Sequence, residues 1–123
     1  MNTAVKTDNI SKTYPGVLAN SNVSITINAS SIHAVVGENG AGKSTLMKIL
    51  YGMIKPDSGN IEIFNNTASI SSPKEAINLG IVMVHQHFML AKNLTVLENI
   101  ILGIDRASLK NLGLSKYKKQ IRE

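Results

Sequence analysis

The sequence predicts an α/β fold that begins with antiparallel strands, and three observations lead to this prediction. Segments that alternate apolar and polar residues, typical of half-buried strands, occupy the first third of the chain. A glycine-rich loop at residues 37–42 separates a short apolar run from a run of helix-forming residues. Apolar stretches and helix-start patterns then follow one another over residues 56–101, as expected of mixed strands and helices.

The strands expected before the loop differ in the clarity of their patterns. Residues 4–14 are a weak strand candidate, which the turn residues 14–16 (Tyr-Pro-Gly) would end. Residues 23–27 alternate apolar and polar side chains throughout and predict a half-buried strand. Residues 32–36 (Ile-His-Ala-Val-Val) are a short apolar run, which we expect to form a buried strand.

The glycine-rich loop carries the most specific pattern in the chain. Residues 37–45 read Gly-Glu-Asn-Gly-Ala-Gly-Lys-Ser-Thr and fill every fixed position of the phosphate-binding pattern G-x-x-x-x-G-K-[ST]. The glycines let the backbone approach a phosphate closely, and the positive end of the following helix attracts the anion. We expect Lys43 to reach the terminal phosphates of a nucleotide and the Ser44 hydroxyl to bind Mg²⁺. The alternative is a glycine-rich turn that precedes a helix by chance. We disfavour it because a strand-like run precedes the loop and helix-forming residues follow it, as the motif requires.

The elements after the loop are marked by caps and turns. A helix is expected over residues 43–51, with Gly52 as its C-terminal cap. The turn residues 56–59 (Pro-Asp-Ser-Gly) lead into residues 60–64, whose alternation predicts another strand.

Two capping boxes mark later helices. Residues 72–75 (Ser-Pro-Lys-Glu) open a short helix that Gly80 would end, and residues 95–98 (Thr-Val-Leu-Glu) open another that runs toward Ile101. The continuous apolar run at residues 81–84 predicts a strand that is buried on both faces. Residues 115–123 place apolar side chains at helical spacing opposite a basic face.

Composition excludes several classes of function. None of the 123 residues is Cys, which excludes disulfides, thiolate metal sites and cysteine nucleophiles. No apolar run approaches the roughly 20 residues that span a bilayer, and the first residues lack a secretory signal pattern. The net charge of +5 is compatible with nucleic-acid binding, but the chain has only 2 Phe, 3 Tyr and no Trp for base stacking. We therefore interpret the late lysines as a solvated helix face and expect no nucleic-acid partner.

Several motifs, taken in chain order, resemble the ATP-binding subunits of ABC transporters. Residues 10–14, which end at Tyr14, resemble the family's adenine-stacking segment, and residues 37–45 resemble its Walker A motif. Gln86, which follows the apolar run, resembles the Q-loop glutamine, and residues 94–100 resemble the segment after that loop. Within this family, the stretch Gly-Ile-Val-Met-Val-His-Gln-His-Phe-Met-Leu that surrounds Gln86 is similar to the ATPases of importers for simple sugars and nucleosides.

This resemblance implies a P-loop NTPase fold with a RecA-like core and an antiparallel β start. It also implies that the chain is the N-terminal part of an ABC ATPase domain. Residues 1–90 would be the core with Walker A and the Q-loop, and residues 91–123 the incomplete start of the helical subdomain. Mg²⁺ would be bound by Ser44 and by Gln86, which is also a candidate contact of the attacking water. The implied nucleotide-binding residues are Tyr14, Gly37, Glu38, Asn39, Gly40, Ala41, Gly42, Lys43, Ser44 and Thr45.

The resemblance also implies cofactors and partners. The cofactors would be ATP and Mg²⁺. The partners would be the membrane permease subunits of an ABC importer and a second nucleotide-binding domain, which places the protein on the cytoplasmic side of the cell membrane as a peripheral subunit. Residues 88–90 (Phe-Met-Leu) would be a docking surface for the permease, although core packing explains this apolar cluster equally well.

The sequence departs from the family's pattern in ways that limit its expected activity. The LSGGQ-type signature, the apolar strand that ends in Asp-Glu and the downstream switch histidine are absent. The family is an ATPase, but we expect this chain to be a fragment that binds ATP without efficient hydrolysis. The alternative is a stand-alone nucleotide-binding or regulatory module with no transport role. A small kinase is disfavoured because Arg106 and Arg122 are the only arginines, and a metal pair of His85 and His87 lacks a third ligand.

Overall fold

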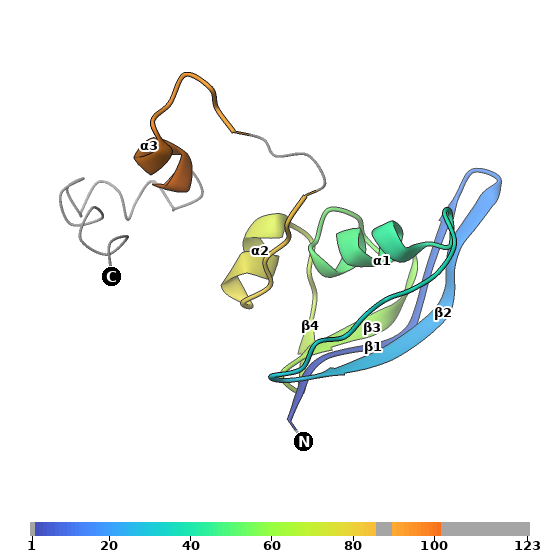
Figure 1. Cartoon of the computed structure of the whole chain (residues 1–123). Coiled ribbons are helices and arrows are strands. Elements are labelled where there is room, and N and C mark those ends of the chain that lie inside the picture. Colours follow the sequence, from blue (N-terminus) through green and yellow to red (C-terminus); the bar gives the residue numbers. More distant parts are fainter. Residues whose placement is uncertain (1, 86–89, 102–123) are drawn as a thin grey trace. The chain divides into compact units, whose positions relative to one another are not determined.

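The structure of this chain is a computed structural model that describes residues 2–85 and 90–101. The chain divides into two compact units, Met1–Val84 and His85–Glu123. The described part of the first unit contains a sheet and two helices, and the described part of the second contains a short helix (Figure 1). The candidate phosphate loop lies in the first unit.

The sheet of the first unit has four strands, β1 (Thr3–Tyr14), β2 (Val17–Asn28), β3 (Ser58–Ile63) and β4 (Asn66–Ala68). Their order is β2-β1-β3-β4, and every neighbouring pair is antiparallel. The long hairpin of β1 and β2 turns at Pro15 and Gly16, with Tyr14 paired to Val17. The antiparallel start that the sequence predicts is therefore confirmed.

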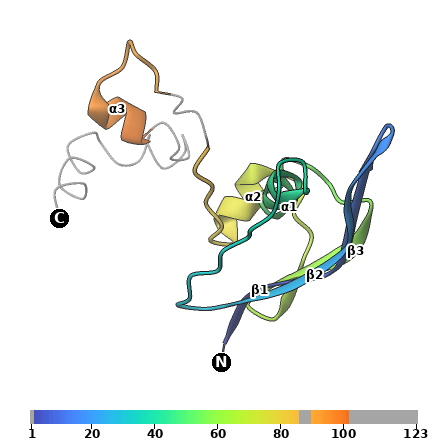
Figure 2. The ribbon, with the colours of Figure 1, turned by 45° about the vertical axis from the view of Figure 1, so that its right-hand side comes forward.

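Helices α1 (Lys43–Leu50) and α2 (Pro73–Asn78) lie on one face of this sheet (Figures 1 and 2). Burying apolar area between a helix and a sheet is the main force that holds two such layers together. The core between the layers consists of Ile10, Leu46, Ile49, Leu50, Ile61, Ile63, Ile70 and Ala76. These core contacts hold helix α1 against the sheet, and its first turn positions the loop that precedes it.

The weak alternation of residues 4–14 has a structural cause. Thr7 and Ile10 are both buried although they are three residues apart, a spacing that places side chains on opposite faces of a regular strand. A bulge resolves this conflict, because the register with both neighbouring strands shifts after Thr7 and Asn9 has a positive φ of 52°. The Thr7 hydroxyl donates to the Val23 carbonyl and accepts from the Ile25 amide, so its burial leaves no polar group unpaired.

Two predicted strands are wrong. Residues 32–36 and 81–84 are not strands, and among the described residues no strand pairs with either segment. Ile32 is 102% exposed and Val36 is 90% exposed, while Val82 and Val84 are 80% and 85% exposed. A strand forms only when neighbouring strands bond its backbone, and apolar composition does not supply those neighbours.

The other predicted elements are found with small differences in their ends. The strand expected at residues 60–64 is β3, but Phe64 lies in a turn with Asn65, both at positive φ (47° and 62°). That turn leads back into β4, which the sequence analysis did not predict because it is only three residues long. Helices α1 and α2 begin and end close to their expected bounds. The helix expected at residues 115–123 lies outside the described residues.

The second unit contains α3 (Val96–Ile101), which begins at the predicted capping box. The Thr95 amide donates to the Glu98 carboxylate at 2.8 Å, and the Glu98 amide donates to the Thr95 hydroxyl at 3.3 Å. The Thr95 amide, and next the Thr95 hydroxyl, which donates to the same carboxylate at 2.7 Å, hold the pKa of Glu98 below its usual value. In the described part of the chain, no helix is long and apolar enough to cross a membrane.

Candidate functional site

The glycine-rich loop ends at the first turn of α1. Gly42 is the N-terminal cap of this helix and has a left-handed backbone, with φ 85°. Glycine has no side chain to accept the first amides of the helix, and those amides have no partner within an α-helix. The amides at the start of α1 are therefore available to an anion, and the helix dipole favours negative charge there.

The loop is held tightly against strand β2. A Cβ atom on Gly42 would lie 2.0 Å from the carbonyl oxygen of Ala19, so the backbone can approach β2 only as glycine. The side-chain Nδ2 of Asn20 donates to the Gly42 carbonyl at 3.3 Å. Asn20 is only 6% exposed, and its Oδ1 atom has no partner within the described residues. This residue was missed by the sequence analysis, because an asparagine in a strand has no pattern of its own.

Lys43 folds back over the loop that precedes it. Its Nζ donates to the carbonyl oxygens of Gly37 at 2.6 Å and of Glu38 at 2.8 Å. An ammonium has three donors, and two of them bond the loop carbonyls. The positive charge therefore lies over the loop, next to the first amides of α1.

A cavity of about 300 Å³ adjoins the loop. It is bounded by β2, by the segment before the loop and by the start of α1, through Asn20, Val23, Ile25, His33, Ala34, Val35, Val36, Ala41, Gly42, Lys43 and Leu46. Its lining is mostly apolar, which differs from the polar surface that a phosphate needs. Ala41, Gly42 and Lys43 form part of its wall, so the cavity adjoins the loop.

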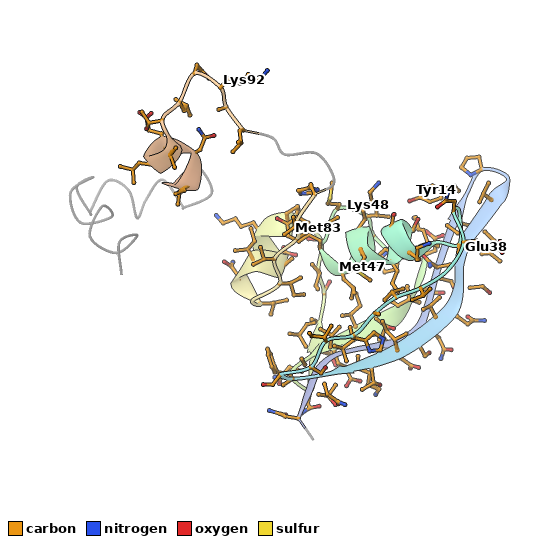
Figure 3. All side chains as sticks on the ribbon, viewed as in Figure 1. Tyr14, Glu38, Met47, Lys48, Met83 and Lys92 are labelled. Carbon is orange, nitrogen blue, oxygen red and sulfur yellow. The ribbon has the colours of Figure 1, made fainter. Side chains whose placement is uncertain are left out.

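Tyr14 lies at the end of β1, and its ring is partly exposed. Lys12 is paired with Asn20 across the hairpin, and Asn20 bonds the Gly42 carbonyl. Tyr14 is two residues beyond Lys12, about 7 Å along the strand. Figure 3 shows Tyr14 and Glu38 toward the same end of α1. The loop therefore contacts the hairpin within a few residues of Tyr14 along the chain, near the end where β1 turns into β2.

The end of β1 is tied to the turn that precedes β3. The Nζ of Lys12 lies 2.6 Å from Asp57 Oδ1 and 5.9 Å from the centroid of the Tyr14 ring. The Thr13 amide donates to Asp57 Oδ2 at 2.7 Å. The hydrogen bond from Lys12, and next the one from the Thr13 amide, hold the pKa of Asp57 below its usual value.

Few protein groups are expected to hold Mg²⁺. No group of three or more His, Asp or Glu side chains that could hold a metal ion occurs among residues 2–85 and 90–101. Mg²⁺ in nucleotide sites keeps several waters and binds through one or two protein ligands and the phosphates, so the single Ser44 hydroxyl fits such an ion. Gln86, the other expected ligand, lies outside the described residues.

Comparison with known proteins agrees with these features. A family model described as ABC transporter matches residues 20–123. The chain is 52% identical over 99 residues to the glucose import ATP-binding protein of Haloferax volcanii, an alignment that covers 80% of this chain. It is 46% identical over 121 residues to the nucleoside import ATP-binding protein of Lactococcus lactis, which covers 98% of this chain. The chain spans only 18% and 24% of the lengths of these two relatives.

Solved structures support the fold. The crystal structure of a nucleotide-free ATP-binding cassette from an ABC transporter matches 83% of this chain and 40% of its own, with a TM-score of 0.76 and 34% identity. The ADP conformation of an ATP-binding cassette matches 84% of this chain and 41% of its own, with the same TM-score and identity. The predicted fold class is thereby confirmed. With its phosphate loop, its antiparallel start and a family match over most of its length, the chain belongs to the ABC transporter family, as part of an ATP-binding domain.

Proposed function

We propose that this chain is the ATP-binding component of an ABC importer for simple sugars or nucleosides. The observation that carries this proposal is the complete phosphate loop, whose lysine lies over the loop carbonyls at 2.6 and 2.8 Å while the first amides of α1 are left for an anion. The names of the relatives support the class of solute, since they are a glucose import ATP-binding protein and a nucleoside import ATP-binding protein.

The loop would hold the phosphates of ATP through its backbone and through Lys43. The amides of the loop and of the first turn surround the phosphate oxygens, and Lys43 offsets the charge of the terminal phosphates. Tyr14 stacks on adenine. Ser44 and Gln86 would hold Mg²⁺, which would offset part of the charge of the phosphates. The remaining loop contacts come from Gly37, Glu38, Asn39, Gly40, Ala41, Gly42 and Thr45.

In this proposal residues 1–90 are the core of the nucleotide-binding domain and residues 91–123 begin its helical subdomain. The whole protein pairs with permease subunits and with a second nucleotide-binding domain, on the cytoplasmic side of the cell membrane. A carboxylate that activates the attacking water is needed for efficient hydrolysis, and the sequence offers no candidate on an apolar strand. The chain alone should therefore bind ATP without sustained turnover.

Titration calorimetry with MgATP and a phosphate-release assay test this proposal. Lys43→Ala should weaken MgATP binding by roughly 10- to 150-fold, the loss expected for hydrogen bonds to a charged group. Lys48→Ala is the matched control, because Lys48 is an exposed lysine in the last turn of the same helix and should leave binding unchanged. Equal binding by the Lys43 and Lys48 variants would contradict the proposal. Sustained hydrolysis that Lys43→Ala abolishes would contradict the expected lack of turnover.

A further inference from the structure

We infer that Asp57 is a positioning residue for base recognition, because it fixes the end of β1 and thereby the ring of Tyr14. This inference rests on the proposed stacking of Tyr14 on adenine. Asp57 lies just before β3, and its carboxylate bonds Lys12 and Thr13 of β1. Its role would be to set how tightly the site binds a nucleoside rather than a bare phosphate chain.

Asp57 makes three polar contacts with consecutive residues of β1. Its amide donates to the Ser11 carbonyl at 2.9 Å, its Oδ1 accepts from Lys12 Nζ at 2.6 Å, and its Oδ2 accepts from the Thr13 amide at 2.7 Å. The backbone pairing of β1 with β3 ends at Ser11 and Ser58. Beyond this last pair, the Asp57 carboxylate bonds the backbone of β1 at the Thr13 amide, where β3 makes no pair with β1.

The Tyr14 backbone is paired with Val17 of β2, but its side chain is exposed. The residue is 37% exposed, and the hairpin turn follows it directly. Lys12 lies 5.9 Å from the ring centroid, within the range of a cation–π contact, and the same ammonium is bonded by Asp57. A cation on one face of the ring leaves the other face for a base. Asp57 thus fixes both the backbone next to Tyr14 and the charged group that covers its ring.

A second ion pair on the same sheet shows why Asp57 differs from an ordinary surface carboxylate. Lys6 and Glu62 also join β1 to β3, at 3.2 Å, but their backbones are already paired with each other. Their ion pair therefore adds little constraint. The lowered pKa of Asp57 keeps its carboxylate ionised at neutral and mildly acidic pH, so its contacts persist under ordinary conditions.

The test compares two ligands that share phosphates and differ in the base. Titration calorimetry would measure the binding of MgATP and of magnesium tripolyphosphate to the full chain and to its Asp57→Ala, Asp57→Asn, Glu62→Ala, Tyr14→Ala and Tyr14→Phe variants. Tyr14→Ala should weaken MgATP binding by roughly 5- to 150-fold, the loss of one stacked base. Tyr14→Phe should be nearly silent, because the ring face makes the contact. Neither substitution should change tripolyphosphate binding.

Asp57→Ala should weaken MgATP binding by roughly 2- to 12-fold, since the ligand must then order the freed ring. Tripolyphosphate binding should not change, which also shows that the variant is folded around the loop. Asp57→Asn keeps an acceptor for the Thr13 amide and should lose less. Glu62→Ala should affect neither ligand.

The outcomes separate this inference from the proposed function. If Tyr14→Ala weakens MgATP alone but Asp57→Ala weakens neither ligand, or weakens both equally, the positioning role of Asp57 is wrong and base stacking stands. If Tyr14→Ala leaves MgATP binding unchanged, the stacking role is wrong and the inference is overturned with it. Failure of the unaltered chain to bind either ligand would overturn the proposed function.

Discussion

At the scale of single residues, the candidate site depends on how closely backbone can approach backbone. Gly40 and Gly42 both have positive φ, at 87° and 85°. Their surroundings differ, because a Cβ on Gly40 would meet nothing within 4 Å, whereas one on Gly42 would lie 2.0 Å from the Ala19 carbonyl. The two glycines therefore separate the effect of backbone conformation from the effect of steric contact.

We predict that Gly42→Ala and Gly40→Ala have unequal effects. Gly40→Ala should cost about 1–2 kcal/mol for a left-handed residue with a side chain, and binding of MgATP should remain measurable. Gly42→Ala adds a collision with β2 that the backbone can relieve only by moving the loop, so MgATP binding should be lost. Calorimetric titration of both variants measures the difference. Similar affinities would show that the contact with Ala19 does not control the loop.

At the scale of elements, the helices begin where side chains satisfy their free amides. The Ser72 hydroxyl accepts from the Glu75 amide at 3.3 Å, and the Glu75 carboxylate accepts from the Ser71 amide at 2.7 Å. The second bond differs from the expected capping box, in which the glutamate returns to the cap residue itself. It still supplies an acceptor next to the helix start. Helix α2 has only six residues, so these bonds form a large part of what fixes it.

We predict that α2 is sensitive to its cap. Ser72→Ala should reduce the local stability of the helix by about 0.5–2 kcal/mol, because the Glu75 amide loses its acceptor. Hydrogen exchange of the α2 amides measures this loss. Ser69→Ala is the control, since Ser69 is an exposed serine outside the helix. Equal protection of the α2 amides in both variants would contradict the role of the cap.

We also predict that the stability of α2 depends on pH in the acid range. Bonds from the Ser71 amide and then from the Ser71 hydroxyl lower the pKa of Glu75 from its usual value of 4.5. A carboxyl with a lowered pKa stabilises the folded form above its unfolded pKa, and this contribution is lost as the pH falls through the folded pKa. Protection of the α2 amides, corrected for intrinsic exchange, should fall when the pH drops below 4.5. Glu75→Gln should remove most of this dependence.

At the scale of the whole molecule, two extended apolar segments remain outside the sheet. Residues 32–36 precede the phosphate loop, and residues 81–84 end the first compact unit. Their outward residues are among the most exposed large apolar side chains described, with Val84 at 85% and Ile32 at 102%. Exposed apolar segments with unpaired backbone promote association through added strands.

We predict that the chain of 123 residues, studied alone, is marginally stable and associates. It should bind a hydrophobic dye and form concentration-dependent oligomers in sedimentation experiments. ATP should stabilise it only modestly, because weak binding adds only RT ln(1 + [L]/Kd). Val36→Lys should reduce association more than Val17→Lys, since Val17 lies on a paired hairpin. A monomer that unfolds in one sharp transition without ligand would contradict this prediction.

The agreement between sequence and structure is closest where the pattern itself is local. The caps at Ser72 and Thr95, the turn after Tyr14 and the loop before Lys43 each depend on residues within a few positions of one another. The bulge at Asn9 was not predicted, because it reflects the fit of β1 to two neighbours at once. Strand β4 was not predicted either, since it exists only as the partner of β3.

The sequence alone determined the order of the early elements, the class of the fold and the position of the phosphate loop, because propensities, caps and glycines act over a few residues. Only the tertiary structure decided which apolar runs become strands, since residues 32–36 and 81–84 have strand-like composition and yet no partner among the described residues. It also decided the contacts of Asn20 with Gly42 and of Asp57 with Thr13, which join residues 22 and 44 positions apart. Such contacts depend on how distant segments pack, and no local pattern encodes them.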